Sequence, residues 1–314
     1  MELILADASQ AVEETTAEVV TLPDTIQLTD TAGSSAMPIT IVSLVAVILA
    51  AALIIFAVWR RHKGTAAMVV GGIATYVVFY LIGGGRIANF ILNMLPSGVS
   101  SNKGIKILIG AIVTSGFAVL GRILVLRLYQ NKLGKLSAST GIGVGLVVME
   151  GLVSIVNYFS YMIFYSTLNK SGWETFIADS STQKMLDAYV NMYEFEPGLH
   201  LAILGWTVVM MVTHIAVSVP LLAAYRSKVS KGWYAICLAY FFILECGYYS
   251  FVLDAMNVGV WMGMSFVATA FFALFCFRMY KKYYADEAFS HIREKEEEIQ
   301  SSKKMPRFNN LSKL

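Results

Sequence analysis

Seven long apolar stretches run through this 314-residue sequence, and they constrain its fold more than any other feature. Each is long enough to cross a hydrocarbon layer of roughly 30 Å as an α-helix. Hydrophobic residues make up 57% of the chain and charged residues only 14%, whereas a soluble domain has about 25% charged residues. The sequence therefore predicts an all-α fold, a polytopic membrane bundle of about seven transmembrane helices. The predicted spans lie at about 38–59, 65–88, 104–128, 141–168, 199–225, 232–253 and 258–280.

The spans divide the chain into three regions. Residues 1–37 carry seven acidic residues and no lysine or arginine, which is typical of a flexible acidic tail. Residues 38–280 form the membrane domain, and residues 281–314 are expected to form a charged helix followed by a frayed tail. The composition excludes an ordinary soluble enzyme, a disordered chain and a secreted disulfide scaffold. The net charge of +3 is too small to indicate a nucleic-acid partner.

The distribution of basic residues predicts the orientation of the chain. Eighteen of the 24 lysines and arginines lie on one side of the predicted spans, in the connections after the first, third and fifth spans and in the tail from Arg278 onward. The connections on the other side hold only four, which are Lys103, Lys106, Lys170 and Lys184. Because cytoplasmic loops are enriched in basic residues, the N-terminus is expected outside the cell and the C-terminus in the cytoplasm.

Two segments outside the spans also have a pattern. In residues 169–199, Met185, Leu186, Tyr189 and Tyr193 recur at helical spacing, which predicts a short helix at the outer membrane surface. Such a helix is either an interfacial anchor or a lid over an outward-facing cavity. The charged run near Glu296 predicts a helix that either docks on a partner or extends the last span into solvent.

Six side chains in or beside the predicted spans are singled out here because a charged side chain within a span costs roughly 2.5–3.5 kcal/mol on insertion scales. Arg86 and Asp254 lie near the outer ends of their spans and are expected at the interface. The other four lie about 10 to 20 Å from the inner ends of four different spans, at a rise of 1.5 Å per residue. The sequence therefore predicts one buried polar layer, which consists of Arg122, Glu150, His214 and Glu245.

The predicted layer has two interpretations. In the first, it is a structural polar network in which Arg122 and Glu150 pair directly and His214 or Glu245 extends the contact. In the second, it is a catalytic or metal site. Zinc in a hydrolase takes three protein ligands and a water, and His214, Glu150 and Glu245 could supply those three. No other histidine joins this layer, and the three cysteines fit as small apolar fillers of the spans.

Four segments on consecutive spans carry a resemblance to a known family. Residues 117–122 read Phe-Ala-Val-Leu-Gly-Arg, where the family has Phe-Glu-Glu-x-Gly-Arg, and residues 143–151 resemble its Gly-x-Gly-His-Gly-Gly-x-Glu-Ala. Residues 214–219 resemble its His-Ile-Ala-x-Ser, and residues 235–240 stand where it has a further histidine. By these segments, residues 38–280 resemble the YhfC family of bacterial intramembrane metalloproteases, which is related to the CPBP and PrsW-type membrane peptidases.

The resemblance implies a bacterial plasma-membrane protein with Glu150 and His214 as its catalytic or metal-binding residues. It also implies groups that this chain lacks. Ala118 and Val119 replace a glutamate pair, and the family's other site residues are replaced by Leu146, Trp206 and Tyr240. Hydrolysis of a peptide needs a base and an activated water, so most of the expected catalytic groups are missing.

Three functions remain open. The first is a pseudoprotease that has no cofactor and binds another membrane protein. The second is an active zinc-dependent intramembrane metallopeptidase with a rearranged site, in which Glu150 and His214 are catalytic and Glu245 is recruited as a ligand. The third is a small-solute transporter, although the spans show no internal repeat of the kind common in transporters.

Overall fold

The computed structural model describes residues 21–63, 66–129, 136–195, 197–287 and 290–304. Within these ranges the chain is helical and has no strand. Seven helical segments are long and apolar enough to cross a membrane, so the prediction of an all-α bundle of seven spans is confirmed. The segments are Ala36–Arg61, Ala66–Asn93, Lys103–Leu128, Leu136–Asp179, Gly198–Tyr225, Gly232–Val252 and Val258–Tyr283.

Most spans are single helices, and two are subdivided. The other spans are α2 (Ala36–Arg61), α6 (Lys103–Leu128), α7 (Leu136–Asp179, which is kinked at Gly172), α11 (Gly232–Val252) and α12 (Val258–Tyr283). The second span consists of α3 (Ala66–Thr75), the π-helix η1 (Tyr76–Gly84) and α4 (Gly85–Asn93). The fifth span consists of α9 (Pro197–Ala216) and α10 (Ser218–Tyr225). Shorter elements outside the spans are α5 (Ser97–Ser100), α8 (Gln183–Glu194), η3 (Ala285–Glu287) and α13 (Ser290–Lys304).

The subdivisions follow from the local sequence. Pro220 has no N–H to donate to the carbonyl four residues earlier, and α9 gives way to α10 at Val217. Wide π-helical turns are rare and occur mostly as single turns, often at functional sites. Here the π-helix holds two tyrosines, Tyr76 and Tyr80, whose rings are stacked with centroids 5.2 Å apart.

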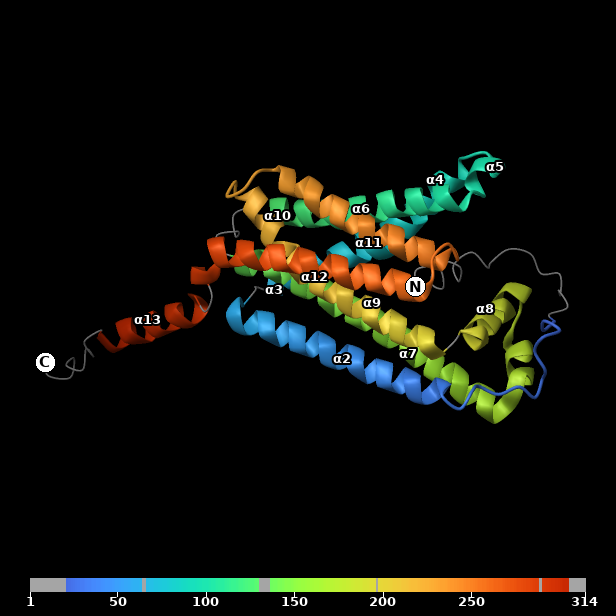
Figure 1. The fold of residues 1–314 in the computed structure, drawn as a ribbon. Coiled ribbons are helices and arrows are strands. Elements are labelled where there is room, and N and C mark those ends of the chain that lie inside the picture. Colours follow the sequence, from blue (N-terminus) through green and yellow to red (C-terminus); the bar gives the residue numbers. More distant parts are fainter. Residues whose placement is uncertain (1–20, 64–65, 130–135, 196, 288–289, 305–314) are drawn as a thin grey trace, which may run out of the picture.

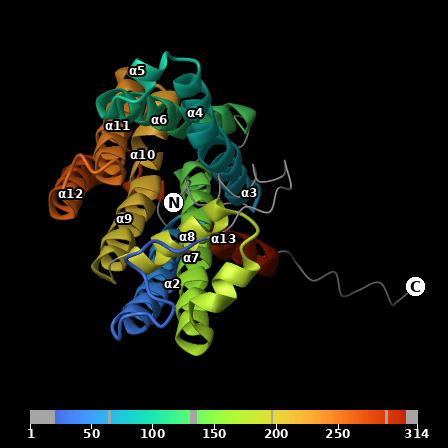
Figure 2. The same cartoon turned by 90° about the vertical axis from the view of Figure 1, so that its right-hand side faces the viewer.

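Helix α7 occupies the middle of the bundle. It packs against α2, α3 and α9, while α6 packs against α11, and α12 packs against α9 and α11 (Figures 1 and 2). The crossing of α3 and α7 is closest at Gly72 and Gly145, whose backbones meet directly: the Cα of Gly145 lies 3.0 Å from the position that a Cβ on Gly72 would take. Two glycines are needed there because any side chain would separate the helices.

The predicted helix between the fourth and fifth spans is present as α8. It is reached through Gly172, whose φ of 65° ends the regular course of α7 and is a conformation that glycine adopts at little cost. Beyond that point, aromatic side chains of α7 and α8 pack together, and Phe176 and Tyr189 have ring centroids 4.6 Å apart. No residue of α8 lines the cavity described below, so the interpretation of this helix as a lid gains no support.

Part of the acidic N-terminal segment packs against the aromatic cluster formed by α7 and α8. Ile26 is buried in it. The backbone of Thr21 exchanges two hydrogen bonds of 3.0 Å with the side chain of Gln183, and the Ala32 N–H donates to Asn169 at 2.9 Å. Residues 21–35 therefore have a defined place in the fold, whereas residues 1–20 of the predicted tail lie outside the described residues.

A carboxylate ties the C-terminal segment to the N-terminus of α7. The backbone N–H of Leu136, the first residue of α7, donates to Glu287 at 2.6 Å. The same side chain forms ion pairs with Arg226 at 3.3 Å and with Lys228 at 3.9 Å. A carboxylate at this position caps a helix N-terminus and complements its dipole. The predicted charged helix is present as α13, which points away from the bundle in Figure 1.

Candidate functional site

The four side chains of the predicted polar layer are all buried. Their exposed fractions are 2% for Arg122, 5% for Glu150, 0% for His214 and 5% for Glu245. Three of them form one chain of contacts, and Glu245 faces the same cavity as Glu150. Arg86 and Asp254, which were predicted near the interface, are exposed.

Arg122 donates to three acceptors. Its Nη1 donates to the hydroxyl of Tyr80 at 2.9 Å and to the carbonyl of Ala118 one turn earlier on α6, and its Nη2 lies 2.6 Å from His214 Nδ1. The guanidinium also lies 4.8 Å from the centroid of the Phe241 ring, over its face. Hydrogen bonds and aromatic contact together allow this charge to be buried.

The contact with Arg122 determines the protonation of His214. A guanidinium has only donors, so Nδ1 must use its lone pair to accept. A neutral imidazole has one such lone pair, and its proton must therefore be on Nε2. Nε2 is fully buried, has no hydrogen-bond partner and lies 3.7 Å from Glu150 Oε2. His214 is thus held as the neutral Nε2–H tautomer, with Nε2 close to a carboxylate but beyond hydrogen-bond distance.

Glu150 completes the chain of contacts. Its Oε2 accepts a hydrogen bond from the hydroxyl of Tyr76 at 2.9 Å and faces His214 Nε2. The order is therefore Arg122, His214, Glu150. The predicted direct pair of Arg122 with Glu150 is wrong, because no ion pair joins them within the described residues. The physical reason is that α7 packs closely against α9 and only slightly against α6, so the imidazole of His214 on α9 lies between the two charges.

Sequence reasoning missed Tyr76 and Tyr80. Their hydroxyl groups donate to Glu150 and accept from Arg122, respectively, so η1 supplies one partner to each end of the chain of contacts. The available signal was a pair of tyrosines four residues apart in an otherwise apolar span. A π-helix changes which positions share a face, and the ordinary helical period does not reveal this.

A partly enclosed cavity of about 90 Å³ lies beside Glu150. Side chains from η1, α6, α7, α9 and α11 line it, and no lysine, arginine or histidine is among them. Trp206 and Tyr248 stack on one another at its wall, with ring centroids 5.4 Å apart and planes 12° from parallel. The lining residues include Glu150, Glu245, Thr114, Trp206, Tyr248 and Tyr249.

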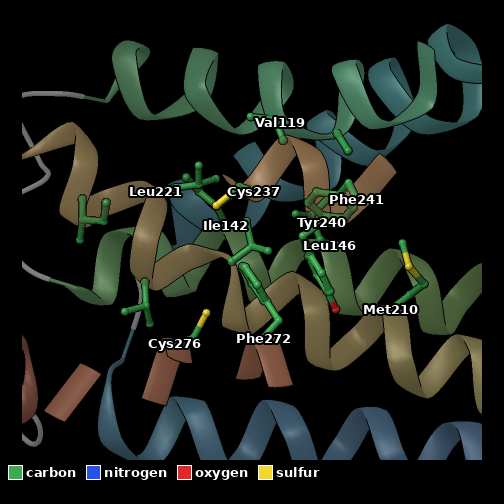
Figure 3. Packing of buried hydrophobic residues seen from close by; sticks show 14 of the residues in the cluster. Val119, Ile142, Leu146, Met210, Leu221, Cys237, Tyr240, Phe241, Phe272 and Cys276 are labelled. Atoms are coloured by element: carbon green, nitrogen blue, oxygen red, sulfur yellow. The ribbon is translucent and has the colours of Figure 1, made fainter. Parts of the chain in front are cut away.

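Positions that hold site residues in the resembled family belong here to apolar packing. Leu146 is fully buried and lies beside Tyr240 and Phe241 in the core (Figure 3). Tyr240 stacks on Phe272 with ring centroids 3.9 Å apart, and its hydroxyl bonds Thr213 and Thr269, each at 2.8 Å. Leu146 and Tyr240 therefore serve here in packing and in hydroxyl hydrogen bonds.

The described residues do not fit the zinc ion that the resemblance implies. No three of their His, Cys, Asp or Glu side chains are grouped so that they could hold a metal ion. His214 Nδ1 accepts from Arg122 and Nε2 carries the proton, so neither nitrogen offers a lone pair. A zinc-bound histidine usually donates its second N–H to a carboxylate or carbonyl, whereas here a cation occupies that place.

Comparisons of the chain with models of protein families, with curated proteins and with solved structures gave no match. The resemblance to the YhfC family therefore rests on the four sequence segments alone.

Proposed function

We propose that this protein is a pseudoprotease: a non-catalytic, multi-pass membrane protein that keeps the scaffold of a membrane peptidase and binds another membrane protein. One observation carries the proposal: Arg122 donates a hydrogen bond to Nδ1 of His214, and this bond occupies the lone pair of that nitrogen. A histidine in this state can neither ligate a metal nor accept a proton from water. Of the three candidate ligands, only Glu150 and Glu245 then remain, whereas a catalytic zinc takes three ligands from the protein.

Binding is the role that such a scaffold retains. The cavity beside Glu150 is partly enclosed, is lined by two carboxylates and several aromatic side chains, and is located between helices that are long and apolar enough to cross a membrane. Ligand sites in helical bundles lie between helices and combine apolar walls with a few polar groups. The active metallopeptidase stays an alternative on the resemblance alone.

A peptidase assay on membrane-embedded substrates tests the absence of catalysis. The purified protein is expected to contain no stoichiometric zinc by elemental analysis, and to cleave no substrate with or without added zinc. The variant His214→Ala serves as the matched control, since it removes the only histidine of the polar layer. Cleavage that is lost both with a chelator and in His214→Ala would disprove the proposal.

We further propose the bacterial plasma membrane as the location, with the N-terminus outside. The basic residues at the ends of the spans support this orientation. In intact cells, an impermeant thiol reagent is expected to label Ser35→Cys, before α2, and to leave Ser230→Cys, between α10 and α11, unlabelled. Both positions are exposed. If Ser230→Cys is labelled and Ser35→Cys is protected, the orientation is the reverse of the one proposed.

A further inference from the structure

A groove of about 550 Å³ lies between α2 and α3. Both helices pack closely against α7 and hardly against one another, so α7 forms the floor of the groove at Val144. Val69 on α3 forms one wall, and the face of α2 from Ala52 to Arg60 forms the other. The volume is within the range of about 300–1,000 Å³ that is usual for ligand sites.

The groove is apolar along its length and basic at one end. Six of its seven lining residues are apolar, and the seventh is Arg60, in the last turn of α2. Ala52 and Arg60 are eight residues apart, which is about 12 Å along a helix that rises 1.5 Å per residue. This length is close to half of a hydrocarbon layer of roughly 30 Å. The groove therefore has the length of one leaflet, with a positive charge where the leaflet's headgroups lie.

The charge of Arg60 has no counter-charge on the helices that form the groove. Its side chain is exposed and forms no ion pair with any described residue. The sequence explains this, because no aspartate or glutamate occurs between Asp30 and Glu150. Arg61 and Lys63, both exposed, add further positive charge at the same end of α2. The glutamates of α13 belong to a helix that points away from the bundle in Figure 1.

We propose that this groove binds an anionic phospholipid, with one acyl chain between α2 and α3 and the phosphate at Arg60. A guanidinium can donate two parallel hydrogen bonds to a phosphate. Trp59, half-buried in the groove wall, is of the residue type that is enriched at the level of the headgroups. In the orientation proposed above, Arg60 faces the cytoplasmic leaflet, whose anionic lipids attract basic residues beside a span. The lipid site does not depend on the pseudoprotease proposal.

Native mass spectrometry of the delipidated full chain in detergent tests the headgroup end of the site. Phosphatidylglycerol and phosphatidylcholine with identical acyl chains are added in equal amounts, and one phosphatidylglycerol is expected to bind in preference to phosphatidylcholine. Arg60→Gln is expected to weaken phosphatidylglycerol binding on the order of tenfold, the effect of losing a hydrogen bond to a charged group. The matched control is Arg61→Gln, since Arg61 is exposed on the same turn but does not line the groove. This variant is expected to keep most of the binding.

A second pair of variants tests the acyl-chain end of the site. Ala52 lines the groove, whereas Ala57 lies outside it on the same helix, and both are exposed. Ala52→Trp is expected to fill the groove and to abolish the binding of phosphatidylglycerol, and Ala57→Trp is expected to leave it unchanged. Thermal unfolding of the two variants is expected to be alike, which separates loss of the site from loss of the fold.

Three results would overturn the lipid site. The first is equal retention of phosphatidylglycerol and phosphatidylcholine by the native chain. The second is an equal loss in Arg60→Gln and Arg61→Gln, which would show that the basic surface attracts lipid without the groove. The third is equal binding by Ala52→Trp and Ala57→Trp while both remain folded. None of these results affects the outcome of the peptidase assay, so the pseudoprotease proposal is tested separately.

Discussion

Replacing Gly145 with alanine is expected to destabilise the bundle by about 1–3 kcal/mol or more, the usual range for overpacking in a filled interior. A Cβ at this position would collide with the carbonyl oxygen of Val69 and would lie 2.9 Å from the Cα of Gly72. Backbone atoms cannot rotate away as a side chain can, so α3 and α7 would have to separate. In the interior of an ordinary helix, replacing glycine with alanine stabilises the helix by up to about 1 kcal/mol. The effect expected at Gly145 therefore has the opposite sign to the one that helix propensity predicts.

Two other glycines in spans provide matched controls for Gly145. Gly116 on α6 and Gly263 on α12 have no heavy atom within 4 Å of an added Cβ. Their alanine variants are expected to be as stable as the native chain or slightly more stable. Thermal unfolding of all variants in one detergent measures the difference. If Gly145→Ala unfolds at the same temperature as Gly116→Ala and Gly263→Ala, the close approach of α3 and α7 is not as described.

Replacing Arg122 with methionine is expected to cost about 3–5 kcal/mol, the range for breaking a buried charge network by removing one partner. The substitution leaves Glu150 without its compensating charge and Nδ1 of His214 without its donor, and it removes the side-chain donor to the carbonyl of Ala118. Combining Arg122→Met with Glu150→Gln removes both charges and is expected to cost much less than the sum of the two single variants.

The energetic coupling between Arg122 and Glu150 is expected to depend on the imidazole of His214. In a His214→Leu background, the coupling between Arg122 and Glu150 is expected to fall to a small fraction of its native value, because His214 lies between the two groups. A coupling that persists at full size would show that the two charges interact directly. Arg86→Met is the control, since Arg86 is exposed and surface substitutions usually stay within about 0.5 kcal/mol.

The sequence predicted the helices better than the contacts between them. Long apolar stretches predict spans because a backbone in hydrocarbon must satisfy its own hydrogen bonds, and the boundaries at Arg61 and Asn257 follow the polar residues there. The depth of Arg122, Glu150 and His214 along their helices also placed them in one layer.

The sequence did not predict how each helix is rotated about its axis or how the helices cross. That Arg122 meets His214 rather than Glu150 depends on how α6, α7 and α9 pack against one another, and depth along each helix does not determine that packing. The roles of Tyr76 and Tyr80 depend on a π-helix for which no sequence signal was available. The close approach of Gly72 to Gly145 likewise depends on how α3 and α7 cross.

The contact between Glu287 and the first residue of α7 has a consequence for biosynthesis. The N-terminus of α7 begins at Leu136, yet the carboxylate that caps it is translated 151 residues later. At ribosomal rates of about 5–20 residues per second, the central helix waits for roughly ten to thirty seconds, with its first amide uncapped, until the last span has emerged. A nascent chain stopped before Glu287 would contain every transmembrane helix and still lack this closure, so the bundle is completed from its C-terminal end.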